Sequence, residues 1–431
     1  MIAGRVSLLC SVFAVACACI STPAAGEDVV AVINAHIHSM GNAGEIAKGA
    51  LVARDGRIVD IGASVAIPSD ARVIDAGGKI VTPGFIAADT SIGLMEIRLS
   101  ADPADNATQS QTISAAFDVS YGLNPQSVVI PVDRLGGITT AVVVPSYSGG
   151  GDKDPLFAGQ AALVTLAHGH QMLLEPRVAM VLAMGEEGAE HAGGSRGAEA
   201  AALRAILADV RDYARRRLEY DQGKTRHYLL SRADLEALVP VAEGRMPLLV
   251  WVRRASDILD VLSLARQEHL RLILDGASEA WRVADQIAAA HVPVLLTPIE
   301  NTPASFEALG STLENAALLA KAGVTVVIKG NGTHRDRELR YNAGNAVAAG
   351  MPYSAALAAV TINPARVFGI VDHSGSLDRG KDADLVIWDG DPFEPSTRPV
   401  AVLIGGREQP MTSRATALRD RYLPVTVSAT H

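Results

Sequence analysis

The sequence predicts an α/β protein, with a TIM-like (β/α)8 barrel joined to a small β-sandwich. From residue 85 onward, short segments rich in Val, Ile and Leu alternate with helical stretches, which is typical of βα units whose parallel strands are buried on both faces. Before that point, residues 29–81 hold only short strands and turns. Asp55-Gly56 between two of these strands indicates a hairpin.

The N-terminal segment, residues 1–25, is predicted to be a secretory signal peptide. Arg5 supplies a positive charge, residues 6–20 are apolar, and small residues at 21–25 offer a cleavage site. The alternative is a retained membrane anchor, but the apolar run is short for a membrane span. We expect an exported protein, periplasmic or secreted, with no transmembrane segment after cleavage.

Charge and cysteine usage exclude several classes of function. The formal net charge of −9 argues against nucleic-acid binding, which requires basic patches. All 3 cysteines lie in the predicted leader. The mature chain therefore offers no cysteine nucleophile, disulfide framework or thiolate zinc site.

The barrel is expected to use eight strands, at 85–91, 139–145, 161–166, 178–184, 247–252, 270–274, 292–297 and 324–329. Residues 198–220 predict an amphipathic helix, because Leu203, Ile206, Leu207, Val210 and Tyr213 recur at helical spacing. Residues 103–128 and 185–197 lack such periodicity. We expect them to be long loops over the C-terminal mouth of the barrel.

Three segments carry a resemblance to a known family. Pro83-Gly84-Phe85-Ile86 indicates a turn feeding a strand that ends in polar residues, Thr361-Ile362-Asn363-Pro364-Ala365 follows a helical stretch, and residues 375–388 return to a strand. Together these segments resemble the amidohydrolase superfamily, most closely its imidazolonepropionase-like and dipeptidase-like branch. The resemblance implies a barrel at 83–374, a β-sandwich from 26–82 and 375–408, and a C-terminal tail at 409–431.

The same resemblance implies hydrolysis of C–N bonds at a divalent metal, zinc or iron. Its ligands would be a pair of histidines on the first strand, one histidine each on strands five and six, and an aspartate on strand eight. This chain has at those positions Asp89, Ser91, Trp251, Asp275 or Gly276, and Asn331 or Gly330. None offers an imidazole, so we predict a degenerate site without a metal cofactor. A hard cation such as magnesium or calcium, held through waters by Asp89 and Asp275, is the alternative.

The missing cation leaves a charge to be balanced. Strand side chains alternate, so Lys329 should face the barrel with Asn331, and Arg253 with Trp251. One hypothesis places the Lys329 ammonium beside Asp89, where it takes over the charge of the metal. The alternative is that Lys329 and Arg253 reach solvent at the mouth.

Three histidines outside these positions are candidates for chemistry. His334 follows strand eight and is either a general base at the mouth or a solvated loop residue. His36 and His38 have metal-pair spacing but precede Pro83 by some distance, so we interpret them as lying on a surface strand. They nevertheless share one face of that strand, which keeps an adventitious metal site open.

Three functions remain compatible with the sequence. The chain could bind a small molecule in the barrel mouth, or partner an intact homologue. Its oligomer would be a homo-oligomer, or a hetero-oligomer with an intact amidohydrolase. It could be an active exported hydrolase of amide or cyclic amide bonds, with unusual metal ligands or none. It could also be a structural module whose pocket is filled by Trp251. An open mouth lined by Asp89, Arg253 and Lys329 would favour the first two.

Overall fold

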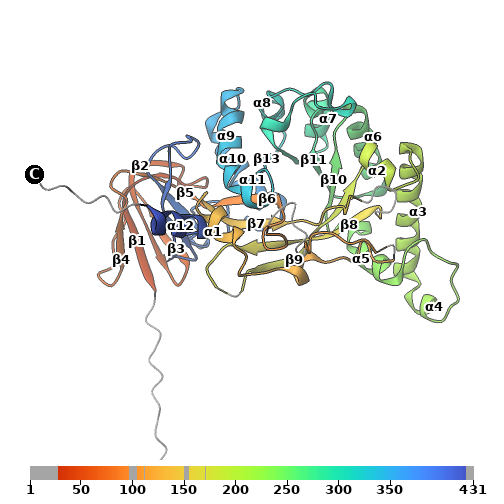
Figure 1. Cartoon of the computed structure of the whole chain (residues 1–431), viewed down its shortest axis with the longest axis horizontal. Coiled ribbons are helices and arrows are strands. Elements are labelled where there is room, and N and C mark those ends of the chain that lie inside the picture. Colours follow the sequence, from red (N-terminus) through yellow and green to blue (C-terminus); the bar gives the residue numbers. More distant parts are fainter. Residues whose placement is uncertain (1–27, 97–103, 111, 150–154, 170, 424–431) are drawn as a thin grey trace, which may run out of the picture.

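The computed structural model describes residues 28–96, 104–110, 112–149, 155–169 and 171–423, and the predicted signal peptide lies outside them. Two eight-stranded sheets organise this part of the chain. In Figure 1 the red and blue strands of the two chain ends lie together at one end of the molecule, and α3 and α4 lie at the other.

The first sheet combines strands from both ends of the chain. β1 pairs with β2 on one side and with β4 and β5 on the other. β5 in turn pairs with β14, β14 with β15, and β15 with β16. The predicted hairpin is confirmed, because Asp55 and Gly56 between β2 and β3 both have positive φ, 49° and 82°. The strands are β1 (Val29–His38), β2 (Glu45–Arg54), β3 (Arg57–Gly62), β4 (Arg72–Asp75), β5 (Ile80–Pro83), β14 (Leu385–Trp388), β15 (Pro399–Ile404) and β16 (Arg407–Glu408).

The second sheet is the barrel, which confirms the predicted fold class. Its strands follow one another in chain order from β6 to β13, and all eight predicted strands are present. Apolar side chains fill its interior, among them Val142, Leu249, Ile273 and Leu295. The strands are β6 (Phe85–Thr90), β7 (Ile138–Val143), β8 (Phe157–Thr165), β9 (Leu173–Ala183), β10 (Leu248–Val252), β11 (Leu272–Gly276), β12 (Val294–Leu296) and β13 (Val326–Ile328).

One strand departs from the regular (β/α)8 pattern. β8 runs antiparallel to both β7 and β9, so the expectation that all eight strands are parallel is wrong at this position. A short turn joins β8 to β9 without an intervening helix in the described residues. The reversal follows from that connection, because a short turn can only link antiparallel strands.

Helices and 3-10 turns cover the outside of the barrel and its mouth. The buried face predicted for residues 198–220 is confirmed in α3, but that helix stops at Arg215 and a short α4 follows. None of the helices in the described ranges is both long and apolar enough to cross a membrane. The helical elements are η1 (Val119–Gly122), α1 (Val129–Arg134), α2 (Glu186–Glu190), α3 (Arg196–Arg215), α4 (Arg217–Asp221), α5 (Arg232–Ala242), α6 (Ala255–Glu268), η3 (Ala280–Val283), α7 (Ala284–Ala289), η4 (Pro298–Glu300), η5 (Phe306–Ala308), α8 (Asn315–Lys321), η6 (Thr333–Glu338), α9 (Leu339–Ala348), α10 (Tyr353–Ala359), α11 (Ile362–Val367) and α12 (Arg414–Tyr422).

A buried tryptophan joins the two sheets. The Trp388 ring at the end of β14 stacks on Phe85 of β6 with centroids 5.2 Å apart, and its Nε1 donates to Thr82 Oγ1 at 2.9 Å. The buried Arg340 guanidinium of α9 donates to the Pro392 carbonyl at 2.9 Å. These contacts fix the barrel, and so its mouth, relative to the first sheet.

Candidate functional site

The mouth of the barrel brings together four side chains from strands that are far apart in the sequence. Asp89 comes from β6, Trp251 from β10 and Asp275 from β11, and Lys329 follows β13 directly. Because β6, β10, β11 and β13 all end on the same side of the barrel, these side chains meet there.

Lys329 is the centre of this group. Its Nζ lies 2.5 Å from Asp275 Oδ1 and also donates to Asp89 Oδ2. Trp251 Nε1 donates to the second oxygen of Asp275 at 3.1 Å. Side-chain exposure is 13% for Lys329, 17% for Asp89 and 0% for Asp275. The hypothesis that Lys329 pairs with Asp89 is confirmed, and the alternative of a solvent-directed Lys329 is wrong.

Burial and ion pairing shift the pKa values of Asp275 and Lys329. Burial raises the pKa of Asp275 to about 7 and the Asp89 carboxylate adds to that rise, while the Lys329 ammonium opposes it. Burial also disfavours charge on Lys329, but the two carboxylates outweigh it and raise the pKa of the ammonium above its ordinary value. Burial therefore dominates at Asp275, whereas the two carboxylates dominate at Lys329. Lys329 stays charged, and Asp275 is left only partly compensated.

The backbone is strained where two of these side chains are presented. Asp89 has φ of 56°, in the left-handed region, and lies in an irregularity of the β6–β7 pairing between Ala87 and Thr90. Ala277, shortly after Asp275, has φ of 31°. Such conformations are unfavourable outside glycine, so the surrounding contacts must hold them.

A further buried carboxyl group, that of Asp336, lies near Asp89 and Lys329 and was not predicted from the sequence. Asp336 of η6 is fully buried and accepts a hydrogen bond from Thr90 Oγ1 of β6 and another from the Gly332 amide at 3.0 Å. Burial raises the pKa of Asp336 to about 7, although both hydrogen bonds lower it. Asp133 of α1 is buried nearby, and burial, then the charge of Asp336, raises its pKa well above the usual range.

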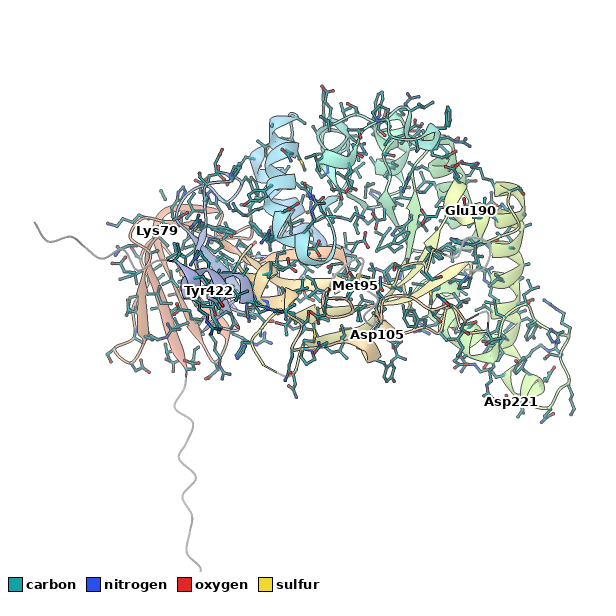
Figure 2. The ribbon with its side chains drawn as sticks, in the orientation of Figure 1. Lys79, Met95, Asp105, Glu190, Asp221 and Tyr422 are labelled. Atoms are coloured by element: carbon teal, nitrogen blue, oxygen red, sulfur yellow. The ribbon has the colours of Figure 1, made fainter. Side chains whose placement is uncertain are left out.

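The mouth contains two cavities that share three lining residues. The first has a volume of about 660 Å³ and the second about 720 Å³, and Trp251, Glu300 and Lys329 line both. Both volumes suit a small organic ligand. In Figure 2 the labelled Met95 marks the segment after β6 that borders the first cavity. Asn106 and Glu186 line these cavities, so both segments predicted as loops, 103–128 and 185–197, reach the mouth. The expectation that 185–197 is a loop throughout is wrong, because Glu186–Glu190 form α2.

The Lys329 ammonium with Asp89, Trp251 and Asp275 forms the floor of the mouth. The other predicted site residues lie around it. Ser91 and Asn331 line the first cavity, and Asn331 Nδ2 donates to Glu338 Oε2 at 2.7 Å. Arg253 is exposed and lines the second cavity. The His334 side chain lies outside the described part of the structure, so its role as a general base stays a prediction.

Two lining residues were overlooked in the sequence. Tyr147 packs edge-on against Trp251 with centroids 5.8 Å apart, and its OH donates to the Leu156 carbonyl at 2.8 Å. It closely follows β7, so its place at the end of a barrel strand was a usable signal. Glu300 ends η4, a turn that no sequence pattern indicated.

Comparison with known proteins identifies the family. A family model described as the amidohydrolase family matches residues 183–413, which is more than half of the chain. The chain belongs to the amidohydrolase family. The curated protein amidohydrolase tasK from Hapsidospora irregularis is 25% identical over 326 residues, covering 68% of this chain and 32% of tasK. The chain therefore spans about a third of the length of this amidohydrolase relative.

Solved amidohydrolase-fold structures agree on the architecture. An amidohydrolase from Thermotoga maritima MSB8 superposes with a TM-score of 0.78 at 24% identity, covering 88% of this chain and 99% of that one. Molinate hydrolase superposes with a TM-score of 0.54 at 17% identity, covering 89% of this chain and 95% of that one. At these identities the likeness shows the shared fold.

Amidohydrolases are generally metal-dependent, but the residues present here do not fit zinc or iron in the barrel. Both oxygens of Asp275 already accept hydrogen bonds, from Lys329 and Trp251, and Asp89 also accepts from Lys329. The indole of Trp251 donates and cannot coordinate a cation. A buried ammonium at this point would also repel a second positive charge.

Proposed function

We propose that this amidohydrolase-family protein binds a small molecule in the barrel mouth without a barrel metal. The observation that carries the proposal is the Lys329 ammonium hydrogen-bonded to both Asp89 and Asp275. It supplies permanently the positive charge that a divalent cation brings to the site in metal-dependent relatives. An immobile ammonium holds the floor of the pocket together, but it has no open coordination position for activating water.

The charges around the mouth indicate the chemistry of the ligand. Asp257 and Glu307 in the second cavity form ion pairs with Arg196, and Asp89 and Asp275 share Lys329. Three further carboxylates line the cavities, Glu186, Glu187 and Glu300, against the single guanidinium of Arg253. The described lining therefore has an excess of negative charge, which favours a ligand carrying an amine or guanidinium group.

Thermal-shift and calorimetric titrations with matched ligands test this proposal. Small amines and guanidines are compared with neutral amides of the same size, on the wild type and on Glu300→Gln. Glu175→Gln is the control, because Glu175 is exposed on β9 and does not line either cavity. We expect the cationic ligands to bind the wild type and the control, and to bind Glu300→Gln at least several-fold more weakly. Equal binding of neutral and cationic ligands would contradict the ligand class.

A metal-free hydrolase is the second candidate, favoured by one observation. Asp275 lines the second cavity with a pKa raised to about 7 by burial, so it can exchange a proton near neutral pH. Hydrolysis of dipeptides or cyclic amides that survives chelator treatment and disappears in Asp275→Asn would support this candidate. Absence of turnover with ligands that bind would leave the binding function as the better account.

We also propose that the protein is exported, on the strength of residues 1–25. The mature chain would then work in the periplasm or outside the cell, alone or in an oligomer with itself or an intact amidohydrolase. Fractionation of cells that express the full chain, with N-terminal sequencing of the mature protein, distinguishes a cleaved leader from a retained one.

A further inference from the structure

A cluster of two histidines and one glutamate lies on the first sheet, outside the barrel. His36 and His38 are two residues apart near the end of β1, so their side chains lie on one face of the strand. Glu45 begins β2 directly opposite His38 in the antiparallel register. The two imidazole centroids are 4.8 Å apart, and His36 Nε2 lies 2.7 Å from Glu45 Oε1.

These three side chains provide a donor set typical of transition-metal sites. Each residue offers one ligand atom, and these atoms all lie within 4.8 Å of one another. Ligands around a tetrahedral zinc ion are separated by about 3.4 Å, given zinc–ligand bonds of about 2.1 Å. Side-chain exposure is 30% for His36 and 61% for Glu45, so small rotations of these side chains are free to bring the donors together.

We propose that His36, His38 and Glu45 form a binding site for a divalent transition metal of the zinc class. Two imidazoles and one carboxylate suit zinc better than magnesium or calcium, which prefer oxygen ligands throughout. Three protein ligands would leave one tetrahedral position for a water molecule. The site would be separate from the barrel mouth, and the amidohydrolase family assignment does not imply it.

The surroundings of His38 favour the ligand form of imidazole. Burial lowers the pKa of His38, with a smaller contribution in the same direction from His36, while Glu45 and Asp391 oppose the change. The ring lies 6.2 Å from the Tyr353 ring of α10, and Tyr353 OH donates to Asp391 Oδ1 at 3.0 Å. Metal ligands need an unprotonated nitrogen, and a nearby carboxylate adds favourable negative charge.

Zinc titration of the full chain by isothermal calorimetry tests the site. We expect the wild type to bind zinc at this site, and His36→Ala/His38→Ala to lose that binding. His38→Gln and Glu45→Gln alone should weaken it at least tenfold while retaining the circular-dichroism spectrum of the folded wild type. His227→Ala is the matched control, because His227 is exposed in the segment before α5 and far from β1 in sequence.

A visible absorption band on cobalt substitution gives a second, independent readout of the ligand set. We expect the band in the wild type and in His227→Ala, and not in the double variant. Absence of zinc binding by the wild type would show that His36 and Glu45 form a hydrogen-bonded pair only. Zinc binding that is unchanged in the double variant would place the metal elsewhere. Either result would overturn the proposal.

Discussion

Lys329 forms ion pairs with Asp89 and Asp275 because three features of its surroundings act together. It follows the short buried strand β13, which directs its side chain into the mouth. Two carboxylates accept from its ammonium, and one of them, Asp275, is completely buried. A buried carboxylate that loses its cation has no solvent to replace it, so the pair is expected to be sensitive to truncation of either partner.

Replacing Lys329 with methionine therefore should destabilise the protein strongly. We expect Lys329→Met to lower the free energy of unfolding by about 3–5 kcal/mol at pH 8, because it leaves buried charge unpaired. The loss should be smaller at pH 5, where Asp275 takes up a proton. Chemical denaturation at both pH values measures this. Lys321→Met, at an exposed position in α8, is the control. Equal stability of Lys329→Met and wild type would refute the buried ion pair.

Much of this floor was predictable from residue types alone. Trp251, Asp275 and Lys329 each lie at the carboxyl end of a recognisable strand, and alternation indicated that Lys329 and Trp251 face inward. Thr90 and Asp336 were not predictable, because their hydrogen bond joins residues 246 positions apart through a turn without a sequence signature. The distribution of one ammonium between two carboxyls also depends on distances that spacing does not provide.

At the scale of elements, the gap between β6 and β13 is the most informative part of the barrel. The hydrogen-bonded order of the described strands runs from β6 to β13 without pairing these two to each other. Near their amino ends the gap is bridged by the chain around α11, where Ile86 N donates to the Val360 carbonyl and Asn363 Nδ2 to the Val326 carbonyl. At the mouth, Lys329–Asp89 and Thr90–Asp336 bridge it through side chains.

Titration of Asp336 should make this closure sensitive to pH. Its folded pKa, about 7, exceeds the ordinary value of 3.8, so the folded state binds more protons between these values. Stability from this group is therefore greatest at low pH and falls as pH rises toward 7. We expect Asp336→Asn to gain stability relative to wild type between pH 5 and pH 8, on the order of 2 kcal/mol.

Thermal unfolding of wild type, Asp336→Asn and the exposed-site control Asp260→Asn across this pH range measures the effect. Parallel pH profiles for wild type and Asp336→Asn would show that Asp336 is already ionised in the folded protein at low pH.

The element pattern was largely visible in the sequence, with one exception. Eight apolar segments and three family-like motifs predicted the barrel and the return of the chain to the first sheet. The reversal of β8 was not predicted, because an apolar segment without alternation has the same composition whichever way it runs. Direction is decided by the connections, and residues 166–172 are too few for a crossover helix.

At the scale of the whole molecule, the fold separates two kinds of chemistry. The barrel mouth gathers carboxylates around a resident ammonium, whereas the first sheet places two imidazoles and a carboxylate together at its surface. Trp388 and Arg340 hold the two parts in contact. Metal analysis of the unmodified protein would therefore mix contributions from both places, and the histidine cluster has to be removed before the barrel is tested.

The direct test is the metal content of His36→Ala/His38→Ala, produced in medium supplemented with zinc, iron and manganese and analysed by mass spectrometry. With Lys329 bonded to Asp89 and Asp275, we predict far less than one equivalent of any of these metals per chain. About one equivalent that persists through dialysis and disappears in the additional Asp89→Asn variant would contradict the claim that an ammonium has replaced the barrel metal.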